Sequence, residues 1–394
     1  MGGRANGIPV SRHPSYLTQI AFLRPWDHDI VHGLAGKKAH LMNWFRSFRC
    51  VSRVFMATTI LIGAGLISAS LSPIIPVVAA ETSEMAPQTK ASSEQVEKLI
   101  GTLRDSNAMS GADLVQRRAG FERLMASTPG PMRVQIRHVD ANGVDGDLIW
   151  PARLHHPIGR RAVLYLHGGG FYSGSLRTHI NIAGALAKAA SADVLLIDYR
   201  LAPESSFPAQ RDDAVAAYRW LLTSGYKAGN IVIAGESVGA TLAIEVALNQ
   251  LHLRGPLPAA IVAMSPVTDF AGTGASLVAN ASEDPFMGKD ELTLIRNAFV
   301  RDRSLDDPDI SPLYGNFSGF PPLLIQVGSR ETLLDDSTRL ADKVRQAGGS
   351  VNLEIWPGMI HQWQIFPFWL DDARKSNARV AEFAISHFAD RPMQ

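Results

Sequence analysis

The chain has 394 residues, of which 46% are hydrophobic and 19% charged, a composition that suits one large α/β domain or two smaller domains. Its 38 basic and 37 acidic residues give a net charge of +1, which provides no electrostatic basis for binding nucleic acid or a strongly acidic partner. Cys50 is the only cysteine, so an internal disulfide and metal sites built on paired cysteines are excluded.

The first 80 residues have the layout of an export signal. Residues 54–80 carry no charge, follow Arg46, Arg49 and Arg53, and end in the small residues Val-Ala-Ala at 78–80. We therefore expect residues 1–80 to be an extension that directs export and is removed, with the protein periplasmic or secreted. The alternative is an uncleaved membrane anchor, because the uncharged stretch 54–72 approaches the ~20 residues that a spanning helix needs.

Residues 81–131 are predicted to form a linker and two helices. Residues 81–93 are polar and contain Pro and Ser, as a linker does, whereas 94–103 and 112–125 have amphipathic helical periodicity. Helices that precede the first strand of an α/β sheet often cover its site. A surface hairpin of helices with no part in binding is the equal alternative.

From residue 132 to 394, strands and helices alternate. Residues 134–139 and 147–150 are predicted to pair around the Asn142-Gly143 turn. Six short apolar runs follow, most with helical segments between them, at 162–166, 194–197, 231–234, 260–264, 323–327 and 351–355. Continuous apolar strands in such alternation predict a doubly wound, mostly parallel sheet with helices on both faces.

The sequence Gly-Glu-Ser-Val-Gly at 235–239 stands between a predicted buried strand and a predicted helix, 240–251. In a nucleophile elbow, the serine of G-x-S-x-G occupies a strained turn at this junction, and only small neighbours avoid a clash there. Ser237 is therefore the candidate nucleophile. It requires a base, an acid that orients the base, and donors for an oxyanion.

The base and the acid should follow Ser237 in the order acid, then histidine. Of the 12 histidines only three lie after Ser237, and His252 and His387 belong to predicted helices. His361 follows the last predicted strand in an irregular loop, at the carboxyl edge of the sheet where catalytic groups gather. It is the candidate base.

The acid should come from the loop after the preceding strand, 323–327. Glu331, Asp335 and Asp336 are available there. The two aspartates open a predicted helix, where acidic residues favour the helix dipole without any catalytic role. Glu331 lies nearer the strand end and is preferred, with Asp335 as the alternative.

A glycine run, residues 168–170, follows His167 directly after the strand 162–166. Bare backbone there allows N–H groups to approach a developing negative charge. A phosphate-binding loop is the rival interpretation, but the run lacks the G-x-x-x-x-G-K-[ST] spacing. His167 is expected to brace the loop.

Several of these blocks together resemble the hormone-sensitive-lipase family of bacterial α/β-hydrolase esterases, over about residues 95–390. The blocks are LYLHGGGFYSGSLRTH, DYRLAPE with FPAQRDDAVAAYRWL, GESVG, VGSRETLLDDS and WPGMIHQW. The resemblance implies an α/β-hydrolase fold with an N-terminal helical cap. It also implies Ser237 as nucleophile, His361 as base, and the N–H groups of Gly169, Gly170 and Val238 as the oxyanion hole.

The chain departs from the family at two places. The family more often has GDSAGG, whereas this chain has Glu236, Val238 and Ala240, and the branched Val238 is expected to narrow the acyl site. The family acid is usually an aspartate in D-P-L-x-D-E, and Glu331 falls on the first position of that motif. Arg200 and Glu204, in the YRLAPE block, are expected to brace a loop.

The predicted function is that of a serine esterase that cleaves carboxylic esters with short acyl chains, without cofactor or metal. Its partner is a small-molecule ester, and it contacts membrane only if the N-terminal segment is retained; the sequence carries no signal for the oligomeric state. Candidates for the pocket wall, with core packing as the alternative, are Phe171, Tyr172, Phe286, Met287 and Trp363.

Two alternatives remain open. The same groups could open lactones or remove acetyl groups from amines or sugars. The scaffold could also bind a small molecule without catalysis, as in the plant gibberellin receptors, which resemble this family but lack the catalytic histidine. Retention of serine, histidine, an acid and the glycine run favours the enzyme.

Overall fold

The computed structural model describes residues 82–84, 88–106, 113–131, 133–153 and 161–390. The expected export signal, the alternative anchor and Cys50 lie outside the described residues. Within those that are described, no helix combines the length and the apolar character needed to cross a membrane.

The described chain alternates strands and helices, as expected. The strands are β1 (Thr82–Glu84), β2 (Val134–Asp140), β3 (Asp145–Pro151), β4 (Ala162–Leu166), β5 (Asp193–Ile197), β6 (Ile231–Glu236), β7 (Ala260–Met264), β8 (Leu323–Gly328) and β9 (Val351–Trp356). The helices are α1 (Lys90–Ser106), α2 (Leu114–Ala126), α3 (Leu176–Ala190), α4 (Ala209–Thr223), α5 (Val238–Leu253), α6 (Ser276–Ala279), α7 (Lys289–Phe299), α8 (Leu334–Gln346) and α9 (Asp371–His387). Short 3-10 turns are η1 (Ala228–Asn230), η2 (Pro312–Tyr314) and η3 (Trp363–Ile365).

The nine strands form one sheet in the order β1-β9-β8-β7-β6-β4-β5-β3-β2. Strands β2 and β3 pair antiparallel, and β3 pairs antiparallel with β5, while the remaining neighbours are parallel. The six predicted buried strands and the predicted antiparallel pair are confirmed. Every residue of β4, β6, β7 and β8 is buried, which is why these strands read as continuous apolar runs.

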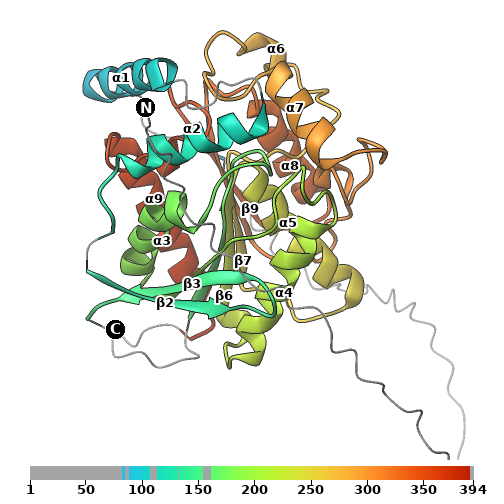
Figure 1. The fold of residues 1–394 in the computed structure, drawn as a ribbon. Helices are drawn as coiled ribbons and strands as arrows, with labels where there is room; N and C mark the ends of the chain where they lie inside the picture. Colours follow the sequence, from blue (N-terminus) through green and yellow to red (C-terminus); the bar gives the residue numbers. More distant parts are fainter. Residues whose placement is uncertain (1–81, 85–87, 107–112, 132, 154–160, 391–394) are drawn as a thin grey trace, which may run out of the picture. The chain divides into compact units, whose positions relative to one another are not determined.

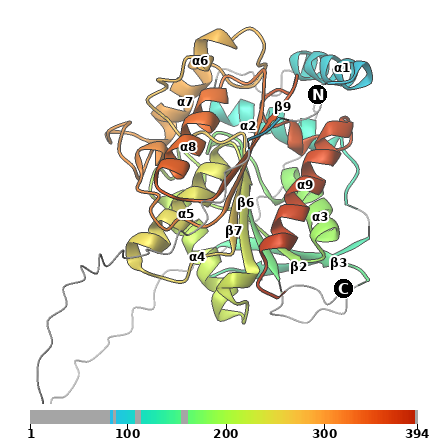
Figure 2. The ribbon, with the colours of Figure 1, turned by 180° about the vertical axis from the view of Figure 1, so that it is seen from behind.

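Helices cover both faces of the sheet, so the doubly wound fold class is confirmed. Helices α3 and α9 lie on one face and α4, α5 and α8 on the other (Figures 1 and 2). Each side has its own apolar core, and α1 and α2 contribute to the core on the side of α3 and α9. Helices α1, α2, α6 and α7 gather beyond one end of the sheet, at the top of Figure 1, and we call these four helices the cap.

The start of α2 is set by a side-chain cap. Helix α2 begins after Asp113, whose carboxylate accepts a hydrogen bond from the Gln116 N–H at 2.8 Å. Helix α1 buries Val96, Leu99, Ile100 and Leu103, whose spacing places them on one face of the helix.

The structure differs from the predicted linker at residues 81–93. Residues Thr82–Glu84 form β1, which pairs with the edge strand β9, and α1 already begins at Lys90. Backbone hydrogen bonding to an open sheet edge selects this strand, and such pairing does not need an apolar pattern in the sequence.

Candidate active site

Ser237 lies at the sharp turn between β6 and α5. Its backbone has φ 55° and ψ −124°, a conformation that residues with a side chain rarely adopt. A methyl group on Gly235 would overlap the backbone of Gly239, and one on Gly239 would overlap the backbone of Leu166 and His167. Glycine at both positions therefore permits the turn, which is the predicted nucleophile elbow.

His361 stands in the loop after β9, and its Nε2 lies 2.9 Å from the Ser237 Oγ. The other two histidines that follow Ser237 in the chain lie elsewhere. His252 is exposed in the last turn of α5, and the His387 ring packs on Phe383 in α9. The structure thus brings His361, and neither of these two, to the serine.

Glu331 contacts the other nitrogen of the His361 ring. Its Oε2 lies 3.1 Å from the His361 Nδ1, while its Oε1 accepts hydrogen bonds from the Gly328 N–H at 2.6 Å and the Ser265 hydroxyl at 2.8 Å. The Asp335 carboxylate instead accepts the Ser276 N–H at 3.0 Å. Of the two carboxylates that the sequence left open, Glu331 is the one in contact with His361.

The neighbouring Asp336 has a structural task. Its carboxylate accepts the backbone N–H groups of Thr268 and Asp269 at 2.7 and 2.9 Å, and so ties α8 to the loop after β7. Both aspartates in the first turn of α8 therefore bond to backbone N–H groups of other segments, and neither caps α8 itself.

Burial governs the electrostatics of the site. Removal from water lowers the pKa of His361 below its ordinary value of 6.5, against the opposing charges of Asp284, Glu236 and Glu291. Burial raises the pKa of Glu331, opposed by its hydrogen bonds from Gly328 and Ser265. A histidine with a lowered pKa is neutral at pH 7, which is the form that accepts a proton from serine.

The glycine run forms a tight loop at the carboxyl end of β4. Gly169 and Gly170 have φ of 107° and 63°, and a methyl group on either would overlap Ser173 or the Tyr172 ring. Ser173 closes the loop, because both its N–H and its hydroxyl donate to the Gly169 carbonyl at 2.9 Å. Val238 is the first residue of α5, where a helix leaves its N–H groups without internal partners.

A buried polar network beneath this loop escaped the sequence analysis. The Glu236 carboxylate accepts hydrogen bonds from the Tyr165 hydroxyl and the Gly168 N–H, and lies 2.8 Å from the His179 Nε2. Glu236 therefore joins the strand before the nucleophile to the start of the glycine loop. An acidic residue at position 236 of the G-x-S-x-G block was the available sign of this network. Its partners could not be identified from the sequence, because they lie 57 or more positions away.

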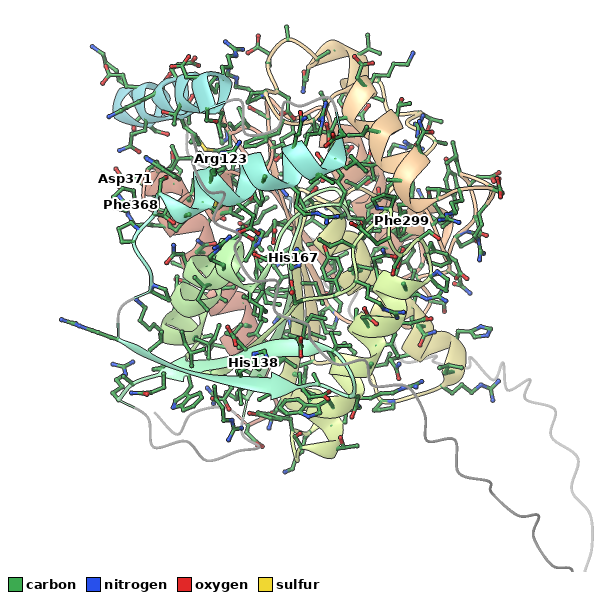
Figure 3. All side chains as sticks on the ribbon, viewed as in Figure 1. Arg123, His138, His167, Phe299, Phe368 and Asp371 are labelled. Carbon is green, nitrogen blue, oxygen red and sulfur yellow. The ribbon has the colours of Figure 1, made fainter. Side chains whose placement is uncertain are left out.

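His167 braces the loop, in agreement with its expected role. Its ring stacks on Tyr199 with centroids 4.2 Å apart and on His179 at 5.2 Å, deep within the molecule (Figure 3). Burial lowers the pKa of His167 to about 3, so this ring is neutral. Its Nδ1 lies 2.8 Å from the Gly168 carbonyl.

Helix α2 contacts the loop that follows the glycine run. Arg118 of α2 donates to the Tyr172 carbonyl at 2.7 Å and the Ala202 carbonyl at 3.1 Å, and pairs with Glu204 at 3.0 Å. Ser237 and His361 are each only 2% exposed. Both side chains are therefore almost wholly buried beneath the surrounding elements.

The five residues named as candidates for the pocket wall are all buried. The Phe171 ring stacks on Phe299 of α7 with centroids 3.9 Å apart, and Phe286 stacks on Phe366 at 5.9 Å. Arg200, named beside Glu204 as a loop brace, pairs with Asp213 at 2.6 Å. These contacts account for the residues as packing and bracing groups around the site.

No group of three or more histidine, cysteine, aspartate or glutamate side chains is placed to hold a metal ion in the part of the chain that the structure describes. A surface hollow of about 510 Å³ lies on the outer side of α2, lined by Arg118, Glu122, Arg123 and Arg177 among others. Ser237, His361 and Glu331 do not line it, and the chemistry points to the buried site instead.

Comparison with known proteins finds relatives that are named as hydrolases, and a match to a family model with the alpha/beta hydrolase fold. Residues 163–365 match a family described by the alpha/beta hydrolase fold. An esterase of Acinetobacter venetianus is 35% identical over 267 residues, which cover 68% of this chain and 87% of that protein. An acetyl-hydrolase of Streptomyces hygroscopicus is 42% identical over 217 residues, 55% of this chain and 72% of the relative.

A solved structure of an esterase from the bacterial hormone-sensitive lipase family superposes with a TM-score of 0.71 at 37% sequence identity. The superposition covers 77% of this chain and the whole of the other.

Proposed function

Because the chain belongs to the α/β-hydrolase fold family, and within it to the bacterial hormone-sensitive-lipase esterases, we propose that Ser237, His361 and Glu331 perform its hydrolysis of carboxylic esters. The protein is a carboxylic ester hydrolase. The observation that supports this assignment most strongly is the continuous line from the Ser237 Oγ through the His361 ring, at 2.9 and 3.1 Å, to the Glu331 carboxylate.

The reaction begins when the Ser237 Oγ attacks the ester carbonyl carbon and its proton passes to the His361 Nε2. Glu331 accepts the Nδ1–H, fixes the ring orientation and stabilises the imidazolium. The oxyanion of the tetrahedral intermediate receives hydrogen bonds from the N–H groups of Gly169, Gly170 and Val238.

The C–O bond to the alcohol then breaks, and the alcohol leaves with the proton held by His361. The acyl group remains on Ser237. Water attacks this acyl-enzyme while His361 takes its proton, and a second tetrahedral intermediate collapses to release the carboxylic acid and restore the Ser237 hydroxyl. Each step uses the same three side chains and the same donors.

Labelling with a fluorophosphonate probe tests the nucleophile. Such a probe bonds to a serine only when a base activates it. We expect one adduct, located on Ser237 by mass spectrometry of the digested protein. Absence of an adduct at neutral pH, with the protein folded, would identify a non-catalytic binder and overturn the assignment.

The proposed substrates are esters with short acyl chains. The side chain of Val238 is fully buried directly after the nucleophile, and the similar Streptomyces hygroscopicus protein is named an acetyl-hydrolase. A series of p-nitrophenyl esters from acetate to decanoate should give its highest kcat/KM at the short end. A maximum at eight carbons or longer contradicts this preference.

Removal of acetyl groups from amines or sugars is the second candidate, because of the same acetyl-hydrolase relative. Comparing kcat/KM for an acetate ester and an acetamide that share the same leaving group apart from its O or N atom, and for a lactone, separates ester hydrolysis from deacetylation of amines and from lactone opening. We expect the acetate ester to be preferred, because an ester carbonyl is less stabilised by resonance than an amide carbonyl and is attacked more readily by the Ser237 Oγ.

We also propose that the protein is exported, with cleavage after Ala80. The basic residues before the uncharged stretch 54–80 and the small residues at its end support this proposal. N-terminal sequencing of the protein from its native host should begin at Glu81. A start upstream, together with recovery in the membrane fraction, identifies the anchor instead.

A further inference from the structure

Glu291 stands in the first turn of α7 and joins two distant parts of the molecule. Its Oε1 accepts a hydrogen bond from the Tyr172 hydroxyl at 2.7 Å, and its Oε2 accepts one from the Arg117 guanidinium of α2 at 2.7 Å. The carboxylate is mostly buried, with 11% of its side chain exposed. The three groups belong to α7, to the loop that follows the oxyanion glycines, and to the N-terminal cap.

Helix α7 supports that loop at further points. A methyl group on Gly170 would come within 3.1 Å of Ile295, one turn along α7 from Glu291, and the Phe171 ring stacks on Phe299 at the end of the helix. The Tyr172 ring itself lies against Gly170. A displacement of Tyr172 therefore passes directly to the glycines whose N–H groups face the oxyanion.

The N-terminal cap contributes a second hold on the same residue. Arg118, next to Arg117 on α2, donates to the Tyr172 carbonyl at 2.7 Å. Adjacent arginines of α2 thus hold Tyr172 by its backbone and, through Glu291, by its hydroxyl. Helices α2 and α7, whose first residues are 175 positions apart in the sequence, both lie over the sheet end in Figure 1.

The charge of Glu291 is also felt by the base. The acidic groups around His361 are Glu331 from the loop after β8, Asp284 from the segment before α7, Glu236 from β6 and Glu291 from α7. Around Glu291 itself stand Arg117 and Tyr172. Glu331 alone among these acids is bonded to His361, so Glu291 acts at a distance, and its negative charge favours the protonated imidazole.

We propose that Glu291 is a positioning residue for the ester hydrolysis, which keeps the oxyanion loop in its productive geometry through Tyr172 and links it to the docked cap helix α2 through Arg117. This role rests on the proposed function of Ser237 and His361. The oxyanion hole is then complete only when α2 is seated, which couples closure of the cap to turnover. The charge of Glu291 adds stabilisation of the imidazolium that forms in the transition state.

Two conservative variants separate position from charge. Tyr172→Phe removes the hydrogen bond and keeps the Glu291 charge. We expect its kcat on p-nitrophenyl acetate to fall about tenfold or more, with little change in KM, because the loss appears in the transition state. The acid midpoint of its kcat/KM profile should stay at the wild-type value.

Glu291→Gln removes the charge, and its amide oxygen can still accept from Tyr172. We expect the acid midpoint of kcat/KM, which reports His361 in the free enzyme, to move to lower pH. A purely structural role for Glu291 would lower the unfolding temperature and leave that midpoint unchanged. The matched control is Asp290→Asn, because Asp290 is the exposed neighbour of Glu291 in the same turn of α7. This variant should have the wild-type acid midpoint and the wild-type unfolding temperature.

Arg117→Met tests the link to the cap. It should lower kcat and also increase the hydrogen exchange of the oxyanion loop, measured by mass spectrometry of the folded protein. Ser237→Ala is assayed beside these variants. If Ser237→Ala keeps its activity, the proposed function itself fails.

The role of Glu291 is refuted if Ser237→Ala is inert while Tyr172→Phe and Glu291→Gln both retain wild-type kcat and acid midpoint. It is equally refuted if Asp290→Asn reproduces their losses.

Discussion

At the scale of single residues, the site depends on which carboxylate faces His361. Glu331 is fully buried and its two oxygens both have hydrogen-bond partners. The Asp335 carboxylate instead accepts a hydrogen bond from the N–H of Ser276, the first residue of α6. The longer glutamate side chain spans from the end of β8 to the imidazole, a position usually served by an aspartate in the family that the chain resembles. The length of the side chain is accommodated without losing the contact.

Glu331→Gln tests this assignment. An amide cannot stabilise the imidazolium and permits the wrong tautomer of His361, so kcat should fall about a thousandfold or more. Asp335→Asn is the matched control and should retain turnover within about twofold, because its carboxylate bonds only to a helix terminus. Steady-state rates on p-nitrophenyl acetate measure both, and the reverse ranking of the two variants would exclude Glu331 as the acid.

The pH dependence follows from His361. Protonated imidazole cannot accept the serine proton, so activity is lost as the pH falls through the His361 pKa. Burial places that pKa below 6.5 in the free enzyme. The kcat/KM profile should therefore lose half of its value only below pH 6.5. A midpoint above 7 would mean that the surrounding carboxylates outweigh burial.

The sequence could identify Ser237 and His361 because the elbow pattern and the chain order are local or ordinal signals. It favoured Glu331 over Asp335 by its place near the strand end but left Asp335 open, since spacing along the chain does not say which side chain turns toward the imidazole. The Glu291 contacts to Arg117 and Tyr172 left no signal at all, because pairs that meet across more than 100 residues are set by tertiary packing.

At the scale of elements, the strand-turn-helix unit of β6 and α5 carries Ser237, the proposed nucleophile. Its geometry depends on glycines that no other residue replaces without overlap. Helix α5 is buried along most of its length, so the turn cannot relax by shifting the helix.

Gly239→Ala should therefore destabilise the fold by about 3 kcal/mol and abolish most turnover, because the added methyl meets the backbone of Leu166 and His167. Gly101→Ala in α1 is the control. No atom lies within 4 Å of a methyl group there, and alanine should stabilise that helix by about 0.5–1 kcal/mol. Urea unfolding measures both changes, and equal stability of the two variants would show that the elbow is not rigid.

Helix α5 also carries Glu245, whose two carboxylate oxygens are buried and have no hydrogen-bond partner among the described residues. Burial raises the pKa of Glu245 well above its ordinary value, with Arg211 opposing the shift. The folded protein therefore binds a proton that the unfolded chain has released. Stability from this group is present below about pH 4.5 and is lost as the pH rises through the folded pKa.

Glu245→Met should raise the free energy of unfolding by about 1–3 kcal/mol at pH 8, and by less at pH 5, because it replaces an unpaired buried acid by an apolar side chain of similar length. Glu94→Met, on the exposed face of α1, should change it by less than about 0.5 kcal/mol. Urea unfolding at the two pH values checks the sign. A destabilised Glu245→Met would indicate that the carboxylate has a partner the fold requires.

At the scale of the whole molecule, much of the fold could be predicted because buried parallel strands leave continuous apolar runs. The ends of β4 and β7 agree with the sequence to the residue. Strand β1 could not be found in this way, because it is short and polar and is selected only by the open edge of β9. The cap helices were visible as amphipathic segments, but their seating on the oxyanion loop depends on single arginines.

The arrangement of the molecule explains why the parts act together. The sheet brings Ser237, Glu331 and His361 from three strand ends to one edge, and α2 and α7 lie beyond that edge in Figure 1. Burial at this edge lowers the pKa of His361. Hydrolysis by this constellation is the central claim.

Turnover of p-nitrophenyl acetate by Ser237→Ala, beside the wild-type protein, tests that claim most directly. The variant removes one oxygen atom from a rigid turn and should fold with an unchanged unfolding temperature. We expect kcat to fall by about four orders of magnitude or more, to the residual rate that binding and the oxyanion donors support alone. Undiminished turnover in a folded Ser237→Ala variant would contradict the account.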